Sequence, residues 1–190
     1  MSHFFAYLGR MKYILRWGLM RNTQPENIQE HSLQVAMIGH GLATISNRYY
    51  GGCVDAQRVT TLAVFHEASE VITGDMATPI KYFNPHIKQA YKDIEQVANR
   101  KLLSMLPEEL RGDYEPLLFQ QDSPEHRLAK AADKIAAYLK CLDELKAGNR
   151  EFEKATQSVR RELDAMDLPE VRHFLERFAP SFSLTLDELN

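Results

Sequence analysis

The sequence predicts an all-α protein, and three observations support this prediction. Apolar residues recur at steps of three and four along most of the chain, as on one face of a helix. Two such series are His31, Val35, Ile38, Leu42 and Ile45, and Leu128, Ala132, Ile135, Leu139 and Leu142. Short alternating apolar runs, which are typical of strands, are absent from the sequence. The 190 residues contain no linker and no repeat, so we expect a single domain over residues 1–190.

Further helices are expected in the ranges 4–14, 55–71, 85–106, 150–166 and 169–178. Asp55 is a suitable N-cap, and so is Ser123, because Pro124 follows it at the first helical position. The sequence Ala147-Gly148-Asn149 is typical of a helix end. The segments 16–27 and 73–84 hold Gly or Pro and are expected to be loops, which on a rigid scaffold often carry binding residues.

The composition excludes several classes of protein. Hydrophobic residues make up 44% and charged residues 26%, which is ordinary for a globular protein. The net charge is -3 with no basic stripe, so we expect no duplex nucleic acid as a partner. Cys53 and Cys141 form no CxxC pair, which favours a reducing compartment. With no signal peptide and no apolar run near the ~20 residues that cross a bilayer, we expect a cytoplasmic protein that is not bound to membranes.

Two isolated residues are candidates for a functional site, and each has an alternative interpretation. His31 shares a face with Val35 and therefore points toward the core, where it would be either a ligand or a buried structural histidine. Asp133 lies among alanines beside the second apolar series. An acid is rarely buried unless it is paired or bound to a metal. The alternative is a solvated Asp133 that pairs with Lys130 or Lys134.

The segment His66-Glu67-Ala68-Ser69-Glu70 has the highest density of reactive side chains. His66 and Glu70 are four residues apart and are expected on one helix face, with Glu67 leaning toward the same region. One imidazole and two carboxylates suit a divalent metal such as Mn, Co, Fe, Ni or Zn, together with acid–base chemistry. Such a metal can lower the pKa of a bound water and offset charge on a phosphate. The alternative is an exposed helix end with solvated glutamates.

The order His31, then His66 with an adjacent acid, then Asp133, resembles the H…HD…D pattern of HD-domain phosphohydrolases. Longer stretches are similar to the bacterial 5'-deoxynucleotidases of that family, over nearly the whole chain. They are Arg16-Trp17-Gly18-Leu19-Met20-Arg21-Asn22, Glu30-His31-Ser32-Leu33-Gln34-Val35-Ala36, Ser69-Glu70-Val71-Ile72-Thr73-Gly74-Asp75, Ala137-Tyr138-Leu139-Lys140-Cys141-Leu142 and Pro180-Ser181-Phe182-Ser183-Leu184.

The resemblance implies a single HD-domain helical bundle around one divalent transition metal, such as Co or Mn, in a homodimer. The substrate would be a 2'-deoxyribonucleoside 5'-monophosphate. Glu70 would assist the attacking water, Arg16 would orient the phosphate through its fork of donors, and Trp17 would leave no room for a 2'-hydroxyl. The implied metal ligands are His31, His66, Glu67 and Asp133. The implied substrate contacts are Arg16, Trp17, His31, Glu67, Asp75, Met76, Ala77, Thr78 and Asp133.

Two positions depart from the family pattern. Glu67 stands where the family has Asp, which keeps the charge but lengthens the arm by one methylene, and Ala77 stands where the related enzyme has Pro. The atoms that bind a metal must be placed to within about 0.5 Å. The longer side chain of Glu67 therefore affects the geometry of the metal site.

A zinc peptidase is disfavoured, because the H-E-x-x-H pattern that begins at His66 has Glu70 in place of its second histidine. The remaining alternatives are another HD-domain nucleotide phosphohydrolase or phosphodiesterase, and a nucleotide-binding protein with a weakened metal site.

Overall fold

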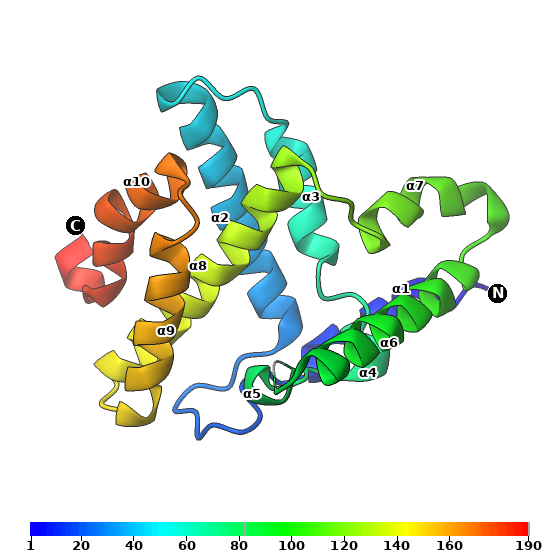
Figure 1. The fold of residues 1–190 in the computed structure, drawn as a ribbon, viewed down its shortest axis with the longest axis horizontal. Coiled ribbons are helices and arrows are strands. Elements are labelled where there is room, and N and C mark those ends of the chain that lie inside the picture. The colour runs from blue at the N-terminus through cyan, green and yellow to red at the C-terminus, as the bar shows by residue number, and fades with distance from the viewer. Residues whose placement is uncertain (82, 190) are drawn as a thin grey trace. The chain divides into compact units, whose positions relative to one another are not determined.

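Figure 1 shows a computed structural model of the chain, which describes residues 1–81 and 83–189. Within these residues the secondary structure consists of α-helices and short 3₁₀ segments, and the only strand-like pairing is an isolated antiparallel bridge between Leu15 and Asn27. The all-α prediction is therefore confirmed. No helix in the described part of the chain combines the length and apolar character that spanning a membrane requires.

The chain forms two compact units, and some helices pass from one to the other. The first unit comprises residues 1–21, 25–32 and 64–121, and the second comprises 22–24, 33–63 and the chain from 122 onward. The expectation of a single domain over 1–190 stays a prediction. α2 (Ile28–Tyr49) begins in the first unit and continues in the second, and α3 (Ala56–Phe65) runs from the second into the first.

The first unit packs short helices around one long one. Its elements are α1 (Phe4–Leu8), η1 (Met11–Tyr13), α4 (Glu70–Thr73), α5 (Thr78–Lys81), α6 (Pro85–Ser104) and α7 (Glu108–Leu118). α6 contacts α1, α4, α5 and α7. A buried cluster of Phe4, Ala68, Leu102, Leu106 and Leu118 forms the core. Ala68 belongs to this core, so the turn that carries His66 and Glu67 rests on buried apolar side chains.

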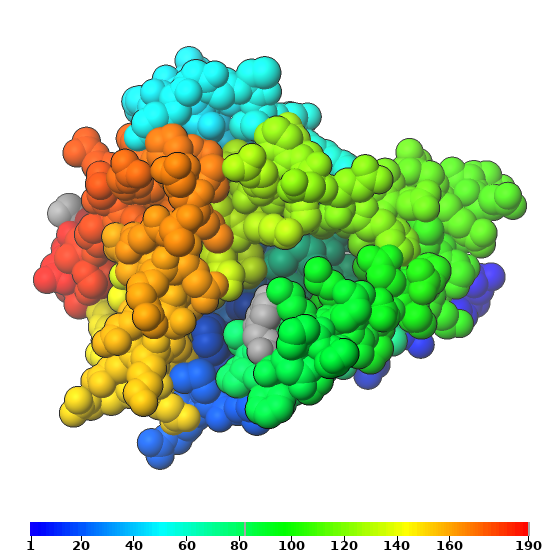
Figure 2. Space-filling model, viewed as in Figure 1, coloured from blue at the N-terminus to red at the C-terminus, as the bar shows by residue number. Residues whose placement is uncertain are grey.

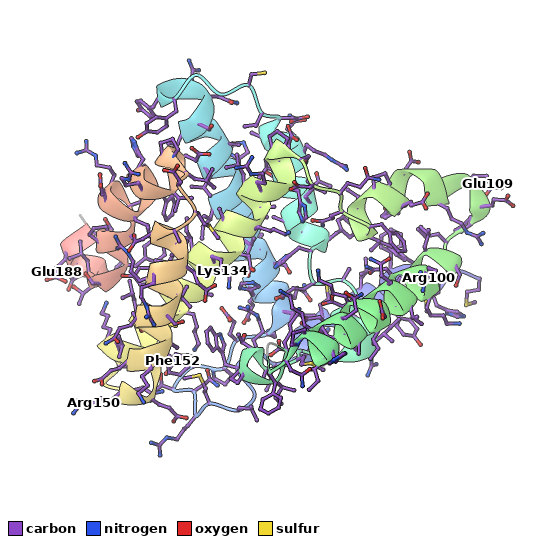
Figure 3. The ribbon with its side chains drawn as sticks, in the orientation of Figure 1. Arg100, Glu109, Lys134, Arg150, Phe152 and Glu188 are labelled. Carbon is purple, nitrogen blue, oxygen red and sulfur yellow. The ribbon has the colours of Figure 1, made fainter. Side chains whose placement is uncertain are left out.

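The second unit is built around α8. Its elements after α3 are α8 (Pro124–Lys146), η2 (Arg150–Phe152), α9 (Glu153–Asp164), α10 (Pro169–Arg177), η3 (Ala179–Ser183) and η4 (Leu186–Leu189). α9 packs along α8, where Lys134 Nζ lies 2.7 Å from Glu162 Oε2 (Lys134 is labelled in Figure 3). Figure 2 shows the side chains of α9 and α10, in orange, at the surface of this unit.

Small residues let three helices of the second unit approach one another closely. A Cβ added to Gly39 of α2 would lie 3.0 Å from Val59 Cγ1 of α3 and 3.6 Å from Ala132 Cβ of α8. Ala131, Ala132 and Ala136 are fully buried, as expected where another backbone comes near. The apolar series that starts at Leu128 thus faces the core, and Asp133 lies at its edge, partly buried.

The predicted helix boundaries that depend on local caps are confirmed. Asp55 Oδ1 accepts hydrogen bonds from the backbone amides of Gln57 and Arg58, at 2.8 and 3.1 Å. Ser123 Oγ accepts one from the His126 amide at 3.1 Å, at the start of α8. α8 ends at Lys146, and Gly148 follows with φ +82°, a conformation that glycine adopts without strain.

Three other predictions about elements are wrong. The helix expected over 55–71 is interrupted, because residues 66–69 form a turn between α3 and α4. The helix expected over 4–14 is divided into α1 and η1, and the segment 73–84 contains the short helix α5. α7 was not predicted, since Gly112 and Pro116 disrupt its helical pattern. Burial of Leu117 and of Leu118, which belongs to the core of the first unit, outweighs these unfavourable residues.

Candidate active site

A closed loop carries the first candidate residues. The chain leaves η1 and returns to α2 through backbone hydrogen bonds from the Arg16 amide to the Glu26 carbonyl at 2.9 Å and from Ile28 to Ile14 at 3.0 Å. Asn27 Oδ1 then caps α2 by accepting from the amides of Gln29 and Glu30, both at 3.0 Å. Arg16 and Trp17 are therefore held beside the first turn of α2, where His31 lies.

Three candidate metal ligands of the first unit come together. His31 is 0% exposed, and its Nε2 lies 3.6 Å from Glu67 Oε1. His66 Nε2 lies 3.8 Å from the same oxygen, and the two imidazole rings are 5.4 Å apart between centroids. One ligand atom from each of the three residues lies within 4.8 Å of the other two. Two imidazoles and a carboxylate form a donor set that fits a divalent first-row metal.

The break between α3 and α4 explains how adjacent residues can face one site. On a regular helix, residues i and i+1 point in different directions. Here the Ala68 amide donates to the Phe65 carbonyl at 3.1 Å and the Glu70 amide to the Glu67 carbonyl at 3.0 Å, the i to i+3 pattern of a tighter turn. The expectation that His66 and Glu70 share one helix face is thus wrong, but the turn directs both His66 and Glu67 toward His31.

Arg16 adds positive charge beside this group of ligands. Its Nε lies 3.3 Å from Glu67 Oε1, and its Nη1 lies 2.6 Å from His31 Nδ1. The guanidinium keeps its charge at any pH at which the protein folds. Arg16 is therefore placed to neutralise a carboxylate and to donate to an anionic ligand.

Glu70 is a buried acid at the start of α4. Burial, followed by the charges of Glu67 and Asp75, raises its pKa to about 9, although Arg16 and Lys81 oppose the shift. Its Oε2 is buried and accepts no hydrogen bond from any described residue. A buried acceptor of this kind is satisfied by water or a cation, so Glu70 fits a site that binds both.

Asp75 follows a glycine turn that ends α4. Gly74 has φ +73°, in the left-handed region that favours glycine, and Asp75 follows it directly. Burial raises the pKa of Asp75, while Arg16 and a hydrogen bond from the Trp17 backbone amide lower it. Asp75 thus lies against the Arg16-Trp17 loop. Met76 and Ala77 follow half-buried, and Thr78 is exposed at the first position of α5.

The last predicted ligand, Asp133, belongs to the second unit, near the middle of α8. It is partly buried beside Ala132, in agreement with its place at the edge of the apolar series. Lys134, the partner considered for a solvated Asp133, forms an ion pair with Glu162.

Sequence reasoning missed Glu26. Its Oε2 accepts hydrogen bonds from Arg16 Nη1 at 2.7 Å and from Trp17 Nε1 at 3.2 Å. A glutamate between a proline and an asparagine is typical of a polar turn, so no local signal distinguished it. Its contacts with Arg16 and Trp17 form only in the folded loop, so they cannot be read from the sequence.

Comparisons with known proteins agree with this geometry. Residues 3–182 match the family model described as 5'-deoxynucleotidase YfbR-like. The chain is 53% identical to 5'-deoxynucleotidase YfbR of Escherichia coli and 52% identical to a 5'-deoxynucleotidase of Vibrio parahaemolyticus, each over 191 residues. These matches cover 100% of this chain and 96% and 98% of the respective relatives.

Solved structures show the same fold at lower identity. An HD-domain phosphohydrolase from Listeria innocua matches with a TM-score of 0.83 and 20% identity, over 95% of this chain and 88% of that one. A cyanophage S-2L HD phosphohydrolase, bound to dA and one catalytic Zn2+ ion, matches with a TM-score of 0.67 and 19% identity, over 93% and 96% of the two chains. The chain therefore has the fold of HD-domain phosphohydrolases and belongs to the YfbR-like family of 5'-deoxynucleotidases.

Proposed function

We propose that this chain is a metal-dependent phosphomonoesterase that removes the 5'-phosphate from 2'-deoxyribonucleoside 5'-monophosphates. The observation that carries the proposal is the meeting of His31, His66 and Glu67 beside the Arg16 guanidinium. Metal ligands and a permanent cation at one place are what hydrolysis of a phosphate monoester requires. The names of the relatives supply the substrate class.

His31, His66, Glu67 and Asp133 would hold the ion, with Asp133 contributed by α8. A bound divalent ion supplies a water of lowered pKa and a positive charge that favours the ionised form of Glu70. Glu70 then accepts a proton from the attacking water, or orients it. Arg16 donates hydrogen bonds to the phosphate oxygens and offsets their charge as the nucleoside leaves.

We further propose that Trp17 packs against the sugar and that Asp75, Met76, Ala77 and Thr78 contact the nucleotide. Cobalt or manganese is the proposed metal, and the enzyme is expected to work as a cytoplasmic homodimer. Neither a membrane nor duplex nucleic acid is proposed as a partner. The net charge of -3 supports the exclusion of duplex nucleic acid.

The deciding experiment is an assay of phosphate release by purified protein with added Co²⁺ or Mn²⁺. dCMP, CMP and a cyclic dinucleotide are supplied separately. Release from dCMP alone supports the proposal. The nucleotide products are also separated by chromatography, because opening of the cyclic dinucleotide to a linear dinucleotide releases no inorganic phosphate; that product would indicate a phosphodiesterase. Binding of nucleotide with no release under either metal would indicate a binding protein whose metal site is weakened by Glu67.

Replacing Trp17 should relax the selection against ribonucleotides. If the indole excludes a 2'-hydroxyl by its bulk, Trp17→Ala opens that space, and CMP becomes a competing substrate. A single methylene in a hydrophobic pocket changes discrimination by roughly 10–200-fold, so we expect the preference for dCMP to fall by at least about 10-fold. The measurement is the ratio of kcat/KM for dCMP and CMP. An unchanged ratio would contradict the steric role of Trp17.

Replacing Glu67 should weaken the metal site in a graded way. Glu67→Gln keeps the shape but removes the negative charge that lies 3.6 and 3.8 Å from the two imidazoles. We expect a loss of metal affinity of at least about 10-fold. Glu67→Asp, the residue of the family pattern, should bind within about 10-fold of the present chain. Calorimetric titration with Mn²⁺ or Co²⁺ measures both, and a Gln variant with unchanged affinity would remove Glu67 from the ligand set.

A further inference from the structure

Trp17 has a backbone conformation that needs external support. Its φ is +61°, in the left-handed region that a bulky residue adopts only at a cost of about 1–3 kcal/mol. Hydrogen bonds hold this backbone on both sides. The Trp17 amide donates to Asp75, and the Trp17 carbonyl accepts from the Met20 amide at 2.9 Å. These contacts fix the main chain of Trp17.

Glu26 contacts the indole of Trp17 directly. The Trp17 Nε1–H donates to Glu26 Oε2 at 3.2 Å, and the same oxygen accepts from Arg16 Nη1 at 2.7 Å. Glu26 Oε1 lies 3.9 Å from His31 Nδ1. The side chain is only 12% exposed, so water competes weakly for these hydrogen bonds. One carboxylate oxygen thus ties the guanidinium and the indole together.

The backbone around Glu26 is held in place by contacts on both sides. Pro25 restricts the chain before it, and Asn27 caps α2 directly after it. The Glu26 carbonyl also accepts the Arg16 amide. Glu26 is therefore anchored to the same helix start that carries His31.

From this arrangement we propose that Glu26 is a positioning residue that sets the placement of Trp17 relative to Arg16, and through it the selectivity for 2'-deoxy sugars. The inference rests on the proposed roles of Arg16 at the phosphate and Trp17 at the sugar. Glu26 Oε2 accepts hydrogen bonds from both the Arg16 guanidinium and the Trp17 indole. Glu26 therefore sets the distance between the group that binds the phosphate and the group that excludes a 2'-hydroxyl. Without Glu26, we expect the indole to lose this placement and the site to accept a ribose more readily.

Trp17 is the only tryptophan of the chain, so its environment can be measured without any assay of activity. In Glu26→Ala, we expect the emission of Trp17 to move to longer wavelength and its quenching by acrylamide to increase. Glu26→Gln keeps the size but loses the charge-assisted bonds, and should give an intermediate result. Glu109→Ala removes an equal charge from the exposed start of α7 (labelled in Figure 3) and should leave the emission unchanged.

The kinetic arm measures kcat/KM for dCMP and CMP in the same variants. We expect the preference for dCMP to fall about 10-fold or more in Glu26→Ala, and by less in Glu26→Gln, because hydrogen bonds to charged groups are the stronger ones. Glu109→Ala should keep the wild-type ratio. A purely structural role would lower both kcat/KM values together and leave their ratio unchanged. Thermal unfolding followed by circular dichroism identifies any variant that is not folded.

The possible results separate this inference from the proposed function. A changed emission with a reduced preference for dCMP supports it. Unchanged emission in Glu26→Ala overturns the positioning role, whether or not the wild-type protein hydrolyses dCMP. A changed emission with an unchanged dCMP/CMP ratio overturns the link to sugar selectivity. Failure of the wild-type protein to release phosphate from dCMP concerns the proposed function alone.

Discussion

Glu70→Gln is expected to lower kcat for dCMP by about 10²–10⁴-fold while making the metal-free protein more stable. The loss of rate follows from removing the group that accepts a proton from the attacking water. The substitution keeps the size of the side chain, which is 8% exposed, so the fold should be retained. The assay uses enzyme loaded with Mn²⁺ or Co²⁺, and an unchanged kcat would remove Glu70 from the mechanism.

The gain in stability follows from the pKa of Glu70. Burial and the neighbouring acids raise that pKa from 4.5 to about 9 in the folded chain. Below pH 4.5 the Glu70 carboxyl is protonated in both the folded and the unfolded protein, so Glu70→Gln gives no electrostatic gain in stability. As pH rises from 4.5 toward 9, the unfolded state ionises first and the folded wild type is progressively destabilised. At about 1.4 kcal/mol per pH unit, the 2.5 units between pH 4.5 and 7 give the Gln variant a gain of at most about 3.5 kcal/mol at pH 7.

Urea unfolding of chelator-treated protein at several pH values measures this effect. The difference in free energy of unfolding between Glu70→Gln and wild type should grow between pH 4.5 and 9. Glu109→Gln, on the exposed start of α7, is the matched control and should show no such growth. A difference that does not depend on pH would mean that Glu70 is not a destabilised acid.

Glu144→Ala is the second change with a large expected effect, a loss of about 3–5 kcal/mol in the free energy of unfolding. Glu144 is 1% exposed and accepts hydrogen bonds from the Thr23 amide at 2.9 Å, Thr23 Oγ1 at 2.7 Å and Asn149 Nδ2 at 2.8 Å. Lys140 Nζ also donates to it, and lies 5.8 Å from the ring centroid of the buried Phe152, which is labelled in Figure 3. Removing the carboxylate leaves the Lys140 charge buried without its counter-ion.

A double variant separates the burial of charge from the packing. Lys140→Met combined with Glu144→Leu removes both charges while filling the same space, and should recover much of the stability lost in Glu144→Ala. The polar groups of Thr23 and Asn149 would still lose their acceptor, so recovery is expected to be incomplete. A double variant as unstable as Glu144→Ala would show that the hydrogen bonds to Thr23 and Asn149, and not the buried Lys140 charge, account for the loss.

The same cluster predicts sensitivity to acid. Burial alone would raise the pKa of Glu144, but the hydrogen bonds from Lys140, Asn149 and Thr23 outweigh it and hold the pKa well below 4.5. The stability that Glu144 contributes is therefore fully present above about pH 4.5 and is lost as the pH falls toward the folded value. Glu144→Gln should unfold with a weaker dependence on pH in the acid range. Equal slopes for the two proteins would contradict the ion pair.

The parts of the fold that could be predicted from the sequence are those specified by local interactions. The caps at Asp55 and Ser123 act within three residues of themselves, and the apolar series along α2 and α8 follow directly from helical periodicity. His31 lies on the buried face of α2 as predicted. Its approach to His66 and Glu67 was indicated by the family pattern, and the distances in the first unit agree with it.

What could not be predicted depends on contacts between distant segments. Glu144 and Thr23 are 121 residues apart, and no local pattern distinguishes this glutamate from a solvated one. The break at residues 66–69 is missed because the apolar residues before and after it continue a helical pattern. The role of Glu26 arises only when the loop closes on α2. In each case the tertiary contacts, and not the local preference, determine the outcome.

The residue at which α2 begins limits where the preceding loop can change in length. His31 lies one turn after Asn27, and its amide donates to the Asn27 carbonyl at 3.1 Å. A helix that began one residue earlier or later would rotate the imidazole by about 100° around the axis. Insertions and deletions before Thr23 leave the register of α2 unchanged, whereas a change of length between Pro25 and His31 would turn the histidine away from Glu67. Natural variation in loop length should accordingly fall before Thr23, whose amide and hydroxyl donate to Glu144.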